Sequence, residues 1–181
     1  MHHSIFEPFP VLCTTRLALR ALRPQDCDRL LALRSDPVVL RYMNRASMTV
    51  PQDAINELNR LQKGLEEGRW VVWAVCQAGD DTLMGTACLW NFDGDSSAEV
   101  GYDLMPCFQG RGYMAEALAA VLGYGFGTLA LRRVEARTHP DNAPSRRLLE
   151  RLGFGLVGME SPQEAGKYEP NVIYEVYRPS L

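Results

Sequence analysis

The sequence lacks the cysteine patterns that mark a disulfide framework or a zinc site. It contains no C-x-x-C pair, and its cysteines are odd in number: Cys13, Cys27, Cys76, Cys88 and Cys107. Such a set is typical of reduced thiols inside a cell. Cys76 and Cys88 lie within apolar segments, so we expect both to act as small buried hydrophobic side chains.

The chain also has no excess of basic residues and no apolar run long enough for a membrane. Its 19 Lys and Arg are outnumbered by 22 Asp and Glu, which argues against a nucleic-acid-binding surface. The most apolar stretch, residues 115–131, includes Glu116 and falls short of the ~20 residues that span a bilayer. The first residues do not resemble a signal peptide. We therefore expect a cytoplasmic protein with neither a membrane nor a nucleic acid as partner.

Internal repeats and low-complexity segments are absent too. With 181 residues, of which 46% are hydrophobic, the chain can bury one substantial core. We expect an N-terminal extension, residues 1–14, followed by a single domain, residues 15–181.

Glycines at 110 and 112 form the most informative feature that is present. In Q-G-R-G-Y-M, residues 109–114, they allow a tight turn whose amides converge on a phosphate at the start of a helix. A Walker A loop is excluded because Tyr113 and Met114 replace its Lys and Ser/Thr. A dinucleotide fingerprint, Gly110-x-Gly112-x-x-Ala115, fits by spacing. Four residues separate Gly110 from the preceding strand, however, and too little chain follows for a doubly wound sheet.

Hydrophobic periodicity predicts the order β-α-α-β-β-β-α-β-α-β-β. The expected strands are 16–22, 70–77, 83–92, 98–105, 133–138, 154–159 and 172–178. The expected helices begin after Pro24, at Pro51 with Thr49 as cap, at Gly112 and at Ser145. Pro106 has no N–H, so we expect the sheet to open where it follows the strand 98–105.

Two motifs together resemble the GCN5-related N-acetyltransferases (GNAT superfamily). Residues 109–114 resemble the pyrophosphate loop Q/R-x-x-G-x-G/A of that family, with Met114 where a small residue is usual. N-A-P-S-R-R-L-L-E-R-L-G-F, residues 142–154, resembles the helix of the RimJ/RimL-like branch, which acetylates the N-termini of ribosomal proteins. The resemblance covers nearly the whole chain.

The resemblance implies an α/β (α+β) GNAT fold. Its sheet is mixed, mostly antiparallel and six- to seven-stranded, with helices on both faces and a cofactor cleft where strands 98–105 and 133–138 splay apart. Acetyl-CoA is the implied cosubstrate, with no metal, and a homodimer is a candidate assembly. The implied cofactor-binding residues are Leu104, Met105, Gln109, Gly110, Arg111, Gly112, Tyr113, Met114, Asn142, Ser145 and Arg146.

Glu99 and Ser145 are the candidate catalytic residues. Glu99 precedes the splay and could draw a proton from the amine, whereas His139 is a weaker candidate base. Many relatives use a tyrosine as the acid, but Leu149 stands at that position here, so that mechanism does not carry over. The resemblance implies instead that Ser145 protonates or hydrogen-bonds the CoA sulfur. Both Ser145 and Asn142 could instead be plain helix-start residues, and Glu99 a solvent-facing strand residue.

Two further residues near the loop have competing interpretations. Glu116 is expected to be structural, bonded near the start of its helix. Cys107 lies beside the loop, and a covalent acyl-cysteine role there is a minor alternative.

The resulting prediction is acetyl-CoA-dependent transfer to a primary amine, in the first place a protein N-terminal α-amine. A small amine such as a polyamine, amino acid or aminoglycoside is the alternative acceptor. A non-catalytic acyl-CoA-binding protein is the alternative from another class. No motif in residues 42–48 and 160–170 identifies the acceptor.

Overall fold

The computed structural model describes residues 6–94, 96–165 and 169–179. The strands are β1 (Leu12–Cys13), β2 (Leu17–Ala21), β3 (Trp70–Gln77), β4 (Leu83–Asp93), β5 (Ser97–Leu104), β6 (Arg133–Thr138), β7 (Gly155–Met159) and β8 (Val172–Tyr177). The helices are η1 (Pro24–Asp26), α1 (Cys27–Ser35), α2 (Pro37–Leu40), α3 (Pro51–Glu66), η2 (Pro106–Phe108), α4 (Tyr113–Gly127), α5 (Ala143–Arg151) and α6 (Pro162–Ala165).

The strands in the described ranges form one sheet of eight, in the order β1-β2-β3-β4-β5-β6-β8-β7. Neighbouring strands are antiparallel except β5 and β6, which are parallel. The predicted mixed, mostly antiparallel sheet is confirmed. It has one strand more than expected because the two-residue β1 pairs with β2, a strand too short to give a periodic signal.

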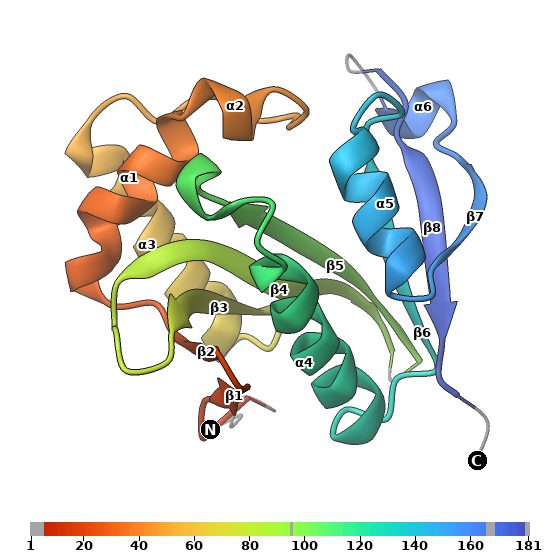
Figure 1. Cartoon of the computed structure of the whole chain (residues 1–181), viewed down its shortest axis with the longest axis horizontal. Helices are drawn as coiled ribbons and strands as arrows, with labels where there is room; N and C mark the ends of the chain where they lie inside the picture. The colour runs from red at the N-terminus through yellow and green to blue at the C-terminus, as the bar shows by residue number, and fades with distance from the viewer. Residues whose placement is uncertain (1–5, 95, 166–168, 180–181) are drawn as a thin grey trace.

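Helices cover both faces of this sheet. In Figure 1, α4 and α5 lie in front of the sheet, and α3 lies behind it. The core between these layers holds large apolar side chains, among them Trp73, Leu89, Leu118 and Tyr174, none with more than 1% of its surface exposed. Phe6 also belongs to this core, at 2% exposed. Phe6, well before β2, therefore packs onto the domain.

Helix α3 begins where the sequence predicts, but its first turn is capped differently. Thr49 does not act as the N-cap; the carboxylate of Asp53 accepts the N–H groups of Thr49 and Val50, at 2.8 and 3.1 Å. Asp53 thereby satisfies two amides that the start of a helix would otherwise leave unpaired.

The sheet opens between β5 and β6. Their pairing covers only residues 97–99 and 133–135, ending at Glu99 opposite Glu135, and the two strands diverge beyond it in Figure 1. This is the predicted splay, but Pro106 does not cause it. The strands separate well before Pro106, while β5 stays paired with β4 as far as Leu104. Pro106 instead begins the turn η2 that leads to the glycine loop.

No helix in the described ranges has the length and apolar character needed to cross a membrane.

Candidate active site

The loop before α4 adopts the tight turn that its glycines predict. Gly110 and Gly112 have φ angles of 75° and 77°, in the left-handed region that a Cβ disfavours. Gly112 is the N-cap of α4 and has no side chain to bond the amides of the first turn. These amides, together with the positive end of the helix dipole, favour a bound phosphate.

The neighbours of the two glycines hold the loop in place. Gln109 donates through Nε2 to the Leu104 carbonyl at 2.8 Å, and its own N–H donates to the Pro106 carbonyl. The amides available to a ligand therefore begin at Gly110, one residue later than expected. The side chain of Met114 is buried in the core, so its size does not obstruct the loop.

Glu116 is bonded to the N-terminal strand region, not to the start of its own helix as expected. Its carboxylate accepts the Thr14 hydroxyl at 2.6 Å and the Arg16 N–H at 2.9 Å, and it forms an ion pair with the Arg16 guanidinium. Arg16 in turn donates to the Arg111 carbonyl at 3.0 Å and stacks over Tyr113. Glu116 and Arg16 thus fix the glycine loop against β2.

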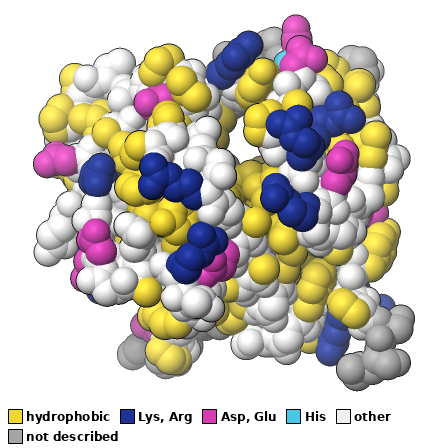
Figure 2. All heavy atoms as spheres, in the orientation of Figure 1, with side chains coloured by type: hydrophobic (Ala, Val, Ile, Leu, Met, Phe, Trp, Pro, Cys, Tyr) yellow, Lys and Arg dark blue, Asp and Glu magenta, His cyan; other side chains and the backbone are white. Residues whose placement is uncertain are grey.

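Helix α5 carries the second motif. Asn142 is its N-cap and accepts the Ser145 N–H at 3.2 Å, as the capping interpretation of Asn142 predicts. Arg146 donates to the Tyr174 hydroxyl at 3.0 Å and the Pro140 carbonyl at 3.1 Å. Two of its donors are therefore engaged within the protein. Figure 2 shows Lys and Arg side chains over α5 and around the start of α4, a charge distribution that suits the phosphates of a nucleotide.

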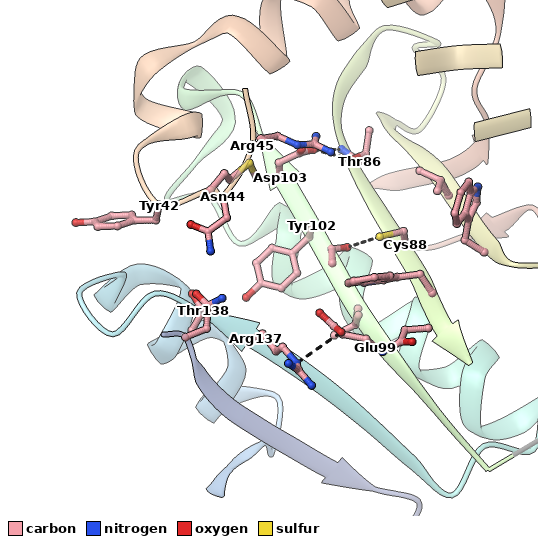
Figure 3. A pocket seen from close by; sticks show the side chains of 18 of the residues that line it. Tyr42, Asn44, Arg45, Thr86, Cys88, Glu99, Tyr102, Asp103, Arg137 and Thr138 are labelled. Atoms are coloured by element: carbon pink, nitrogen blue, oxygen red, sulfur yellow. Dashed lines mark hydrogen bonds and ion pairs between the residues drawn. The ribbon is translucent and has the colours of Figure 1, made fainter. Parts of the chain in front are cut away.

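A cavity of about 770 Å³ lies at the opening of the sheet. This volume is within the range of ligand sites in proteins. Its walls come from α1, from α3 and the segment before it, from β3 to β6, and from α5 and α6. Figure 3 shows the ring of Tyr102 projecting from β5 into this cavity. The lining includes Tyr42, Asn44, Trp70, Cys88, Trp90, Glu99, Gly101, Tyr102, Asp103, Arg137, Asn142 and Ser145.

Glu99 lies at one end of the cavity, where the last paired residues of β5 and β6 meet. It is only 8% exposed, and its carboxylate is 3.7 Å from Nε of Arg137. Burial raises the pKa of Glu99 to about 7; Arg137 opposes this shift and the nearby Glu135 carboxylate adds to it. A carboxyl group with such a pKa can take up and release a proton near neutral pH. Glu99 is therefore not a solvent-facing residue.

A buried ion pair lies further along β5. Arg34 of α1 is 2.9 Å from the Asp103 carboxylate, which also accepts the Thr86 hydroxyl at 2.6 Å. Glu99 and Asp103 are four residues apart on one strand and share a face, so about 13 Å of sheet separates them. Between them, Gly101 lines the cavity with backbone alone. A Cβ at this position would lie 2.9 Å from the Cys88 sulfur.

Neither the buried cysteines nor Cys107 and His139 offer a reactive group to the cavity. Burial raises the pKa of Cys88 to about 12 and that of Cys76 to about 11, so both stay thiols at neutral pH. Cys107 is exposed on η2 and does not line the cavity. His139 also lies outside the lining; its Nε2 is 2.7 Å from the Glu169 carboxylate and its ring stacks on Tyr42.

Two residues of the site were not found from the sequence. Tyr102 hydrogen-bonds to Ser145 across the opening, at 2.8 Å. Arg137 approaches the carboxylates of Glu99, Glu135 and Glu160. Both lie in ordinary alternating strand patterns, so no local signal distinguishes them from structural residues.

Known proteins match both the sequence and the fold. The family described as "acetyltransferase (GNAT) domain" matches residues 16–155. The chain is 34% identical over 171 residues to a Bacillus licheniformis protein described as uncharacterized N-acetyltransferase p20, with 94% of each chain covered. Mycobacterium smegmatis RimJ, in complex with CoA-disulfide, has a TM-score of 0.78 at 22% identity, with 89% of this chain and 81% of RimJ covered.

A third match is the ribosomal-protein-S5-alanine acetyltransferase of Vibrio fischeri. It has a TM-score of 0.79 at 19% identity, with 93% of this chain and 97% of that chain covered. At these identities both solved structures support the fold alone, whereas the sequence matches extend over most of the chain. This protein therefore belongs to the GCN5-related N-acetyltransferase (GNAT) family and is an N-acetyltransferase.

Proposed function

We propose that this enzyme transfers the acetyl group of acetyl-CoA to a protein N-terminal α-amine, of the ribosomal-protein type. The observation that carries the proposal is the cavity itself, which reaches from Glu99 on one side of the opened sheet to Ser145 on the other. A proton acceptor and a hydroxyl group thus border one space. The glycine loop at the start of α4 would hold the pyrophosphate end of the cosubstrate.

Acetyl-CoA fits the cleft by its chemical parts. Its pyrophosphate would bind the amides from Gly110 to Met114, with Arg111 and Arg146 near the phosphates. Residues 100–104 of β5 have no strand partner on the β6 side, so their backbone groups can pair with the amides of the pantetheine arm. The thioester would then lie beside Tyr102 and Ser145. The CoA bound to RimJ supports this choice of cosubstrate.

Glu99 would serve as the base. As the amine nitrogen bonds to the thioester carbon, its proton passes to the Glu99 carboxylate, directly or through water. The C–S bond then breaks, and its electron pair goes to the sulfur, where Ser145 donates a hydrogen bond. Near pH 7 a carboxyl group with a pKa of about 7 is half ionised, which suits the acceptance of a proton.

An α-amine is the acceptor that needs the least help. With a pKa of ~8, about one-tenth of it is neutral at pH 7, whereas a lysine amine at ~10.4 is neutral only about once in a few thousand molecules. Carboxylates gather where the amine would arrive: Glu99, Glu160 and Glu164 line that end of the cavity, with Arg137 as their common cation. This surplus of negative charge favours a cationic acceptor.

An acceptor screen by thiol release tests the proposal. Peptides with a free N-terminus should release CoA thiol, and the same peptides with a blocked N-terminus and an internal lysine should not. Polyamines, amino acids and aminoglycosides form the second arm. Turnover confined to this second arm would replace the peptide by a small amine as the acceptor.

A further inference from the structure

One hydrogen bond joins the two sides of the opening. The hydroxyl oxygen of Tyr102 on β5 lies 2.8 Å from Oγ of Ser145 on α5. Both residues line the cavity. The two residues belong to elements on opposite sides of the splay, so this hydrogen bond spans the opening.

The chemistry of the pair indicates which hydroxyl donates. A phenol is a far stronger acid than an aliphatic alcohol, so tyrosine is the better donor and serine the better acceptor. Burial raises the pKa of Tyr102 to about 12, against the opposing effect of its hydrogen bond to Ser145. Tyr102 therefore keeps its proton throughout the neutral range.

A Ser145 oxygen that accepts from Tyr102 keeps its own hydrogen free. The backbone N–H of Ser145 donates to Asn142 Oδ1, so this capping bond does not use the Ser145 hydroxyl. The serine hydrogen can then point into the cavity. A hydroxyl that accepts a hydrogen bond also becomes a stronger donor, because the two bonds polarise each other.

We infer that Tyr102 is a positioning residue, whose hydroxyl donates to Ser145 and holds the serine hydrogen toward the sulfur of CoA. The inference rests on the proposed function, because it takes the sulfur to lie beside Ser145. It adds Tyr102 to Ser145 as a residue that acts on the sulfur of CoA, the leaving group of the reaction.

The Tyr102–Ser145 pair stabilises the departing thiolate and does not protonate it. A thiol with a pKa of ~8.5 gives a thiolate that is too weak a base to remove the proton of a tyrosine with a pKa of about 12. When the C–S bond breaks, the electron pair stays on sulfur as a hydrogen-bonded thiolate. The proton that the amine loses goes to Glu99, and the thiolate takes up its proton from solvent after release.

The pH dependence of CoA binding tests this without any acceptor. A donor aimed at the sulfur favours the thiolate, so the thiol pKa should be lower in bound CoA than in free CoA. The affinity for CoA, relative to acetyl-CoA, should then rise with pH between about 6 and 9.5. Each unit of pKa lowering corresponds to a tenfold gain; for one hydrogen bond to a charged group we expect roughly threefold to tenfold. Acetyl-CoA has no thiol and is the internal control.

Three variants identify the donor chain by calorimetry across this pH range. Ser145→Ala should abolish the gain, and Tyr102→Phe, which keeps the packing of the ring, should abolish most of it. The double variant should be no worse than Ser145→Ala alone, because Tyr102 acts through Ser145. Equal melting temperatures of the variants exclude a loss of fold as the cause.

The outcomes separate the inference from the proposed function. A full gain in Tyr102→Phe, or a double variant that loses clearly more than Ser145→Ala, overturns the positioning role and leaves the function standing. A wild-type protein whose affinity for CoA, relative to acetyl-CoA, does not rise with pH also overturns the positioning role and leaves the function standing. A protein that binds neither CoA nor acetyl-CoA contradicts the proposed function, and the inference with it.

Discussion

Replacing Glu99 with glutamine should make the enzyme more stable as it becomes less active. The raised pKa of Glu99, about 7 against an ordinary 4.5, means that ionising this carboxyl is costlier in the folded protein than in the unfolded chain. The difference of about 2.5 units corresponds to about 3 kcal/mol. Glutamine has the same shape and no charge, so it removes this cost.

The sign of the effect follows from proton binding. Below pH 4.5 the carboxyl is protonated in both states and has no influence. Between pH 4.5 and 7 the folded state holds a proton that the unfolded chain has lost, so the free energy of unfolding falls as pH rises. Above pH 7 the full cost is present. Glu99→Gln should therefore equal the wild type near pH 4.5 and exceed it by up to about 3 kcal/mol at pH 8.

Urea unfolding of both proteins at a series of pH values measures this difference. The variant loses a 3.7 Å ion pair with Arg137, which retains Glu135 and Glu160. Activity should change in the opposite direction, with a ~10²-fold loss of rate that higher pH partly restores as more amine becomes neutral. A stability difference that does not vary with pH would refute the raised pKa, and with it the electrostatic basis for Glu99 as the base.

Glu135→Gln is the matched variant. It removes a carboxylate from the same arginine, but Glu135 does not line the cavity. The wild-type rate should rise with pH through about 7 as Glu99 ionises. In Glu135→Gln this rise should remain and move to lower pH, because a neighbouring negative charge is gone. Disappearance of the rise in this variant would mean that Glu99 is not its source.

Four further predictions concern the glycine loop, Ser145 and one glycine in each of α3 and α4. Gly112→Asp should weaken acetyl-CoA binding at least tenfold, ~1.4 kcal/mol, in calorimetry, because a carboxylate would face the pyrophosphate. Ser145→Ala should lower kcat far more than acetyl-CoA affinity, since the thiolate develops only during reaction. Gly64→Ala should lower the free energy of unfolding in urea by ~1–3 kcal/mol, because its Cβ would lie 1.9 Å from the Trp70 ring. Gly123→Ala should instead raise it by up to ~1 kcal/mol, because a Cβ there would have nothing within 4 Å on an exposed helix face.

Local chemistry made much of the site predictable. Gly110 and Gly112 adopt the left-handed conformations that only glycine takes up easily, and the strand and helix boundaries follow periodicity, Pro and Gly to within a few residues. Helix α5 begins at Ala143, two residues before the predicted Ser145, with Asn142 as its N-cap. These features depend on residues close together in the sequence, so the sequence alone carries them.

Contacts between distant segments were not predictable. Glu116 bonds Thr14 and Arg16, about a hundred residues away, although a capping role within its own helix was the local expectation. The opening of the sheet begins after Glu99, before Pro106, since only residues 97–99 pair with β6. The Tyr102–Ser145 bond depends on that opening. Such contacts follow from how the strands are arranged, which no local pattern states. Homodimer formation and cytoplasmic location stay predictions.

The most direct test of the account uses one peptide with two different amines. The peptide carries a free N-terminal α-amine and one internal lysine, and it is incubated with acetyl-CoA and the enzyme near pH 7. Tandem mass spectrometry then locates the acetyl group. The account predicts a single acetyl group on the α-amine, and slower acetylation when Gly112→Asp replaces the wild type at a limiting acetyl-CoA concentration. Acetylation of the lysine instead, or no acetylation of peptides by an enzyme that binds acetyl-CoA and acetylates a small amine, would contradict it.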